Sequence, residues 1–264
     1  MKNIKFNIIK VLAFVLLASS CNDVLDEAPD NRIEAIDSPE KIAELLVAAY
    51  PDAAYVPFLE PMSDNAGDKG PSADTGIDFA TTLNQRMYFW DDINDIDDDT
   101  PTYYWNRAYK AIAQANQALI SIEELGGGSE LNALKGEALM CRAYAHFMLV
   151  SIFSKAYNPS TANTDLGIPY VTKPETVLLG KYERGSVENV YNQIQNDIEA
   201  GLPLVKDNYN VPAFHFTKKA ANAFASSSVK LPQKGTSNAI SASASLQLPA
   251  RDNSSIILGN IYLG

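Results

Sequence analysis

The chain contains few of the residues that bind transition metals. Its 264 residues include two histidines, His146 and His215, and two cysteines, Cys21 and Cys141. The histidines are far apart in the sequence and lack the short spacing that is typical of zinc ligands. The sequence therefore predicts no metal site built from histidine and cysteine.

Basic residues are also scarce. Lysine and arginine number 21 against 32 aspartates and glutamates, which gives a formal net charge of −11. A nucleic-acid partner needs a basic surface, so this charge argues against one. The chain also lacks a glycine-rich phosphate loop, a nucleophile elbow and an HExxH motif. Acidic residues are abundant, but no pair stands in the apolar context that a glycosidase needs. We therefore expect a protein that is not an enzyme.

The apolar run of residues 11–18 is far shorter than the ~20 residues that cross a bilayer. Basic residues precede it, and two serines and Cys21 follow it. This order predicts a secretory signal peptide over residues 1–20. A cysteine at the cleavage point resembles the lipobox of bacterial lipoproteins, in which that cysteine becomes the lipidated first residue. Cys21 is therefore the predicted lipid-attachment site, and an ordinary signal peptide with an incidental cysteine is the alternative.

Residues 21–37 are acidic and contain a proline, so we expect a solvated tether. The stretch directly after Cys21 also resembles the acidic signal of Bacteroidetes lipoproteins that are displayed on the cell surface. A lipidated Cys21 leaves Cys141 without a disulfide partner. Because Cys141 lies within a helical pattern, we expect it to be a small buried side chain.

Helical periodicity dominates the rest of the chain. The apolar residues after residue 100 recur at spacings of three and four, which predicts amphipathic helices. A glycine run at 126–128 separates two of them, so these two should pack as an antiparallel hairpin. The pairs Ala143–Phe147 and Ala220–Phe224 have the spacing of tetratricopeptide repeats. The predicted fold is all-α, with tetratricopeptide-like helical hairpins and long irregular loops. The predicted helices are 38–50, 102–125, 129–155, 186–202 and 217–225.

Residues 51–100 lack steady periodicity, and we predict a long excursion with little regular structure. Long loops in compact domains are often functional. Sugars are bound by aromatic faces, with carboxylate, amide and guanidinium groups on their hydroxyls. The alternative is that Trp90 and its neighbour Phe89 only pack the excursion onto the helices. The candidate ligand-binding residues are Asp64, Asn65, Arg86, Tyr88 and Trp90.

The acidic run Asp91–Asp99 invites comparison with a calcium loop. Asp95, Asp97 and Asp99 alternate as oxygen ligands would. An EF-hand, however, needs a glycine at its sixth position and a glutamate at its twelfth, and this run has neither. We expect a solvated acidic loop that also caps the next helix, with no cofactor; a weak calcium site is the open alternative.

Several short phrases follow one another along the chain in a specific order and spacing. They are YYWNRAY (103–109) with Ala115-Asn116, GEA (136–138) with RAY (142–144), DLGIPY (165–170), RGSV (184–187), Ile194 with Asp197-Ile198, and TKKAA (217–221). In this order and spacing they resemble the SusD/RagB family, the relatives of component D of a starch-utilisation system. Together the phrases are specific, although each alone is not, and the resemblance extends from the signal peptide to about Ala225.

The resemblance implies a surface lipoprotein of Bacteroidetes, anchored in the outer membrane and facing the cell exterior. Members of the family bind glycans or other nutrients over a TonB-dependent transporter of the SusC type. They are not enzymes, and their fold is all-helical. The resemblance therefore implies a polysaccharide or oligosaccharide ligand, a SusC-like transporter partner and a membrane contact through the lipid. It does not identify the glycan.

The family pattern is covered only in its first half, as the N-terminal helical domain of residues 38–225. Residues 226–264 are rich in serine and contain a single acidic residue, Asp252. This change of composition indicates a frameshift product, and a divergent serine-rich tail is the alternative. A frameshift predicts that the missing half is encoded downstream in another frame. The alternative functions are a non-functional truncated fragment and a helical-repeat adaptor that binds only the transporter.

Overall fold

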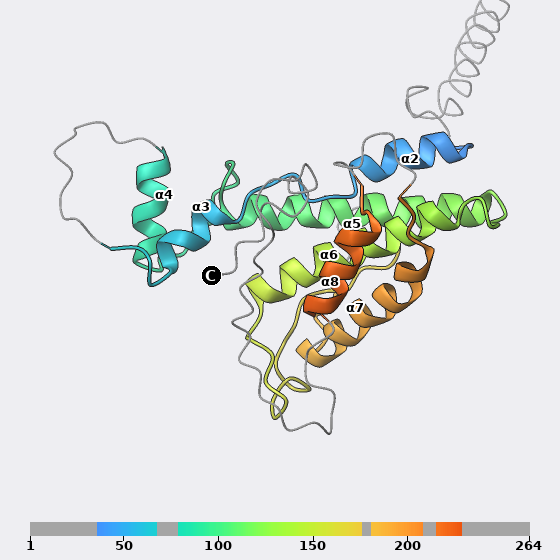
Figure 1. Cartoon of the computed structure of the whole chain (residues 1–264). Coiled ribbons are helices and arrows are strands. Elements are labelled where there is room, and N and C mark those ends of the chain that lie inside the picture. The colour runs from blue at the N-terminus through green and yellow to red at the C-terminus, as the bar shows by residue number, and fades with distance from the viewer. Residues whose placement is uncertain (1–35, 68–78, 176–180, 208–214, 229–264) are drawn as a thin grey trace, which may run out of the picture. The chain divides into compact units, whose positions relative to one another are not determined.

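The computed structural model describes residues 36–67, 79–175, 181–207 and 215–228. Within these ranges every regular element is a helix, apart from one isolated bridge between Leu166 and Ser186, so the predicted all-α class is confirmed. None of the described helices is long and apolar enough to cross a membrane. The elements are α2 (Pro39–Val47), α3 (Val56–Leu59), η1 (Glu60–Met62), α4 (Phe79–Tyr88), α5 (Pro101–Glu124), α6 (Asn132–Phe153), α7 (Val187–Gly201), η2 (Leu202–Leu204) and α8 (Lys218–Ser228) (Figure 1).

The chain divides into two compact units, Met1–Ile36 and Asp37–Gly264, and all of these helices belong to the second. The predicted signal peptide, Cys21 and nearly all of the predicted tether lie outside the described residues. The tail beyond Ser228 lies outside them as well. The predicted domain boundaries therefore stay predictions.

Side-chain caps start three of the helices. The hydroxyls of Ser38, Thr100 and Ser186 accept backbone N–H groups in the first turns of α2, α5 and α7, at 3.4, 3.2 and 3.1 Å. Such caps satisfy N–H groups that have no partner inside the helix. Proline follows the cap in α2 and α5, where its missing N–H costs nothing. The predicted starts of the helices at Ser38 and Ser186 are thus confirmed.

The hairpin of α5 and α6 turns at three glycines. Gly126, Gly127 and Gly128 have φ values of 86°, 65° and 118°, a region that favours residues without a Cβ. The two long helices then run back along each other, as Figure 1 shows in green. Ala108, Ala115 and the rest of the small residues on this face of α5 are buried, which lets the two backbones approach closely.

Helix α6 is the centre of the unit. It packs against α2, α5, α7, α8 and η2. All residues from Gly136 to His146 are buried, although the sequence pattern predicted a single apolar stripe. A Cβ on Gly136 would stand 2.9 Å from the carbonyl oxygen of Gly201 in α7. The glycine pair therefore allows α6 and α7 to cross at backbone distance. Cys141 is fully buried, as predicted.

Helix α8 closes one side of α6 through aromatic rings. Phe224 lies 5.6 Å from Tyr144, 5.5 Å from Phe147 and 6.2 Å from Phe216, measured between ring centroids. The two predicted alanine–phenylalanine pairs thus meet at this interface, because Phe147 and Phe224 touch. Helix α8 continues through Ser228, three residues beyond its predicted end at Ala225.

The prediction of little regular structure in residues 51–100 is wrong for part of the segment. It contains α3, η1 and α4. Tyr55 and Phe58 pack on Tyr104 of α5, with ring centroids 5.9 and 6.0 Å apart. Leu83 and Met87 are the buried residues of α4 whose side chains are described. Two apolar positions do not make a recognisable period, so the sequence alone could not identify this helix.

Candidate functional site

The aromatic residues at the end of α4 form an exposed surface. Phe89 is 58% exposed and Trp90 is 69% exposed, while Tyr88 is half-buried and meets Phe89 edge to face at 5.2 Å. The interpretation that Phe89 and Trp90 pack the excursion onto the helices is therefore wrong. We call Tyr88, Phe89 and Trp90 the aromatic end of α4.

Trp90 ends α4 in a left-handed conformation, with φ of 59°. Its N–H donates to the carbonyl of Met87, and the N–H of Asp91 donates to the carbonyl of Arg86, at 3.0 and 2.9 Å. This is the Schellman motif, in which glycine is the usual residue. A side chain at such a φ costs roughly 1–2 kcal/mol. The backbone of α4 therefore holds the exposed indole at an energetic cost.

Arg86 is engaged in organising the loop that follows. Its guanidinium donates to the carboxylate of Asp95 at 2.8 Å and to the carbonyl of Asp92 at 2.6 Å. Thr100 binds the other end of the loop, since its hydroxyl lies 3.0 and 2.7 Å from the carbonyls of Asp95 and Asp97. The same hydroxyl caps α5. Arg86 thus orders this loop, and its predicted contact with ligand stays a prediction.

The acidic loop does not gather its carboxylates around one point. Within residues 36–67, 79–175, 181–207 and 215–228, no three histidine, cysteine or acidic side chains are placed to hold a metal ion. In the loop itself, the Asp95 carboxylate is paired with Arg86.

Asp64 and Asn65 lie in the turn after η1, and both are exposed. The Asn65 N–H donates to the hydroxyl of Ser63, which helps to shape this turn. Helix η1 packs against α4. The turn that holds Asp64 and Asn65 and the aromatic end of α4 therefore lie on neighbouring elements. The assignment of all five candidate residues, Asp64, Asn65, Arg86, Tyr88 and Trp90, to a ligand stays a prediction.

A buried polar network joins α5, α6 and α7, and sequence reasoning assigned it no role. Arg142 donates from two nitrogens to the carboxylate of Asp197, at 2.7 and 2.6 Å, and from a third to Asn116 at 2.9 Å. The Tyr170 hydroxyl donates to the same carboxylate at 2.6 Å. The Asn116 amide donates to the carbonyl of Val171 at 3.0 Å. Residues 165–172, which we call the strap, are thereby tied to three helices.

His146 of α6 also binds the strap. Its Nε2 accepts the Val171 N–H at 3.0 Å, its Nδ1 lies 2.8 Å from the carbonyl of Arg142, and its ring stacks on Tyr170 at 3.8 Å. Burial lowers the pKa of His146 to about 3, because the charged ring would lose its hydration. The neutral imidazole therefore donates through Nδ1 and accepts through Nε2. Of this network, Asn116, Arg142, Tyr170 and Asp197 stand in the phrases that carry the family resemblance, whereas His146 does not.

A second set of buried hydrogen bonds connects the segment that follows α2 with α6 and with the residues just before α8. The Glu137 carboxylate is fully buried, accepts the Tyr50 hydroxyl at 2.7 Å and lies 2.8 Å from His215 Nδ1. Tyr50 in turn accepts the Phe216 N–H at 2.7 Å. Burial raises the pKa of Tyr50 well above its ordinary value. Tyr50 and Glu137 thus position the segment that enters α8.

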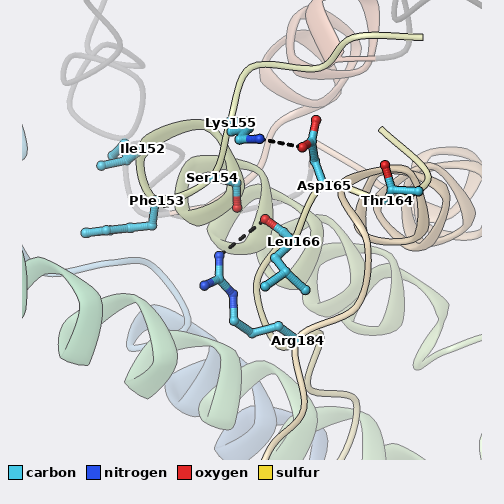
Figure 2. Close-up of a pocket in the computed structure, with 8 residues that line it drawn as sticks. All are labelled: Ile152, Phe153, Ser154, Lys155, Thr164, Asp165, Leu166 and Arg184. Atoms are coloured by element: carbon cyan, nitrogen blue, oxygen red, sulfur yellow. Dashed lines mark hydrogen bonds and ion pairs between the residues drawn. The ribbon is translucent and has the colours of Figure 1, made fainter. Parts of the chain in front are cut away.

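A pocket of about 580 Å³ lies where α6 ends against the strap (Figure 2). Lys155 forms an ion pair with Asp165 at 2.7 Å on one side of it, and Arg184 donates to the Leu166 carbonyl at 3.2 Å on the other. The sequence did not single out this place as a site. The lining residues are Ile152, Phe153, Ser154, Lys155, Thr164, Asp165, Leu166 and Arg184.

Solved structures share this fold. A SusD superfamily protein from Bacteroides thetaiotaomicron is 21% identical, with a TM-score of 0.55, over 72% of this chain and 42% of that one. A SusD-like carbohydrate-binding protein from Bacteroides vulgatus is 20% identical, with a TM-score of 0.55, over 73% and 41%. A laminarin-binding SusD-like protein is 20% identical, with a TM-score of 0.51, over 72% and 39%. This chain thus spans less than half the length of these three proteins. No curated protein matches it.

The family comparison covers most of the described structure. The profile of a SusD-like family matches residues 23–229, which include every described helix. That family is described as starch-binding and associating with the outer membrane. On this match, the chain belongs to the SusD-like family.

Proposed function

We propose that this chain is an outer-membrane lipoprotein, exposed at the cell surface, that captures a glycan or another nutrient for a TonB-dependent transporter of the SusC type. Membership of a family described as starch-binding supports the binding role, as do solved relatives named for carbohydrate and laminarin binding. The lipid would be carried by Cys21. Binding is non-covalent and needs no catalytic group.

The exposed aromatic end of α4 carries this proposal. An indole that the backbone holds at 69% exposure presents a flat apolar face to solvent. Such a face packs against the apolar C–H surface of a sugar ring. Tryptophan is suited to this contact because it combines a large apolar ring with an N–H group that can hydrogen-bond. Asp64 and Asn65, on the neighbouring turn, supply acceptors and donors for sugar hydroxyls. Arg86 supports the site from the loop side.

The test is affinity electrophoresis of the full chain in gels containing starch, laminarin or other polysaccharides. We expect retardation by at least one polysaccharide and a roughly tenfold loss of affinity in Trp90→Ala, equivalent to ~1.4 kcal/mol. Ile96→Ala is the matched control, because Ile96 is 72% exposed on the adjacent loop but has no ring. It should bind as the unaltered chain does.

Two results would contradict the proposal. Equal affinity of the Trp90→Ala and unaltered chains would remove the aromatic end of α4 from the binding site. Retention of the chain by a SusC-type transporter, with no retardation by any polysaccharide, would instead favour the adaptor function.

A further inference from the structure

The pocket at the end of α6 carries one uncompensated positive charge. Of its three charged lining residues, Lys155 and Asp165 neutralise each other in an ion pair at 2.7 Å. The remaining one, Arg184, forms no ion pair with any residue in the described part of the chain. The chain as a whole has a formal net charge of −11. A local cationic site in such a chain is suited to an anionic ligand.

The guanidinium of Arg184 is already oriented. It donates from Nε to the carbonyl of Gly167 and from Nη2 to the carbonyl of Leu166. Both carbonyls belong to the strap, which the buried network of Arg142 and Asp197 holds in place. An arginine has five N–H groups in a fixed plane, so these two contacts leave donors for a ligand. A carboxylate suits that plane because it accepts two parallel hydrogen bonds.

Part of the pocket lining is apolar. Phe153 and Ile152 line it, and the ring of Phe153 is steadied edge to face by Trp105 at 5.0 Å. The Leu166 side chain is exposed at the rim. Ser154 also lines the pocket, and its buried hydroxyl has no hydrogen-bond partner within the described residues.

The size of the pocket fits a small ligand. Its volume of about 580 Å³ falls within the range of roughly 300–1,000 Å³ that is typical of small-molecule sites. A ligand with a carboxylate at one edge and a C–H face at the other would match both the Arg184 guanidinium and the apolar part of the lining. A sugar acid has this combination, because its ring carries both the carboxylate and an apolar face.

We propose that this pocket binds a carboxylate-bearing sugar residue, a uronate, separately from the aromatic end of α4. The carboxylate accepts hydrogen bonds from Arg184, and the ring packs against Phe153. The same charge chemistry is offered by a free carboxylic acid, so the test must separate a uronate from a carboxylate without a ring.

The experiment is a titration of the full chain with D-glucuronate, D-glucose and acetate, followed by saturation-transfer NMR and calorimetry. We expect glucuronate to bind at least tenfold more tightly than either of the others. Arg184→Gln should lower the affinity for glucuronate about tenfold. Lys181→Gln is the matched control, since it removes the same charge from an exposed position on the same segment and should change nothing.

A second variant separates binding from folding. Leu166→Glu introduces a carboxylate at the pocket beside Arg184, at a residue that is 60% exposed, and should abolish glucuronate binding with an unchanged circular dichroism spectrum. The proposal is overturned if Arg184→Gln or Leu166→Glu binds glucuronate as the unaltered chain does. It is also overturned if glucose or acetate binds as tightly as glucuronate.

Discussion

Two arginine–aspartate pairs show how differently the helices around α6 and the connection after α4 are built. Arg142 and Asp197 are buried between α6 and α7, with a tyrosine and an asparagine completing their hydrogen bonds. Arg86 and Asp95 lie at the surface, with side chains 35% and 47% exposed. Removing one partner of a buried pair is costly, because the charge that remains is buried without a partner and without hydration. An exposed pair contributes little.

The same contrast holds for phenylalanine. Phe224 is buried against three rings, whereas Phe89 is mostly exposed. The helices around α6 therefore depend on the identity of each side chain for stability. The connection depends mainly on backbone geometry, through the end of α4 and the cap of α5. Exposed residues can therefore change there without unfolding the helices.

The largest expected effect comes from breaking the buried pair. Arg142→Leu leaves the Asp197 carboxylate uncompensated and should lower the free energy of unfolding by roughly 3–5 kcal/mol. Urea denaturation followed by circular dichroism measures it. Arg86→Leu is the control in the exposed pair and should cost less than about 1 kcal/mol. Similar losses in the two variants would erase the distinction between the regions.

The next effect compares the two phenylalanines. Phe224→Ala empties space among Tyr144, Phe147 and Phe216 and should cost roughly 3 kcal/mol, as large-to-small changes in cores do. Phe89→Ala should lie within about 0.5 kcal/mol of the unaltered chain, because nothing is left unfilled. Thermal melts at a fixed protein concentration rank the two. A larger loss from Phe89→Ala would show that the aromatic end of α4 is structural.

The third effect is a loss of stability at acidic pH, and it arises from His146 in α6. The pKa of His146 is lowered to about 3 in the folded chain, so the unfolded chain binds this proton first as the pH falls. Below a pH of about 6.5, stability should therefore fall by up to ~1.4 kcal/mol per pH unit, until the folded pKa is reached. Unfolding free energies at pH 7 and pH 5.5 measure the slope. In His146→Gln the slope should be smaller, and an unchanged slope would refute the assignment.

The smallest expected effect is a gain in the free energy of unfolding, whereas most substitutions lower it. Trp90→Gly relieves the left-handed backbone and should raise stability by about 0.5–1 kcal/mol, less than the full strain because glycine also loosens the unfolded chain. The same variant should lose polysaccharide affinity in electrophoresis. Asp99→Gly is the control, since Asp99 has φ of 66° and no ring. It should keep its affinity, and equal losses in both variants would detach binding from the indole.

Local signals were enough to predict much of the helical framework. The caps at Ser38 and Ser186 and the glycine turn act within a few residues, so their effects can be seen in the sequence. The burial of aromatic residues in α5 shows where local signals end. Trp105 and Tyr104 are neighbours in one helix, yet Trp105 is half-buried and Tyr104 fills the core. The arrival of α3 decides which of these two rings is covered.

The candidate sites depended on distant parts of the chain. Arg142 and Asp197 are 55 residues apart, so nothing local announces their pairing or the strap that it holds. Arg86 was chosen as a ligand candidate from its residue type alone, and only the structure shows that the following loop folds back onto its guanidinium. The exposure of Trp90 could not be decided from the sequence either, since a buried and an exposed indole have the same local pattern.

The sequence by itself determined the helical class, the main helix starts, the turn between α5 and α6, and the buried state of Cys141. These follow from propensity, capping and periodicity, which act over a few residues. Only the tertiary structure decided that α6 is buried on all sides, that the strap is clamped to three helices, and that a cationic pocket opens where α6 ends. Each of these depends on contacts among several elements, and the sequence of no single element determines the free energy of those contacts.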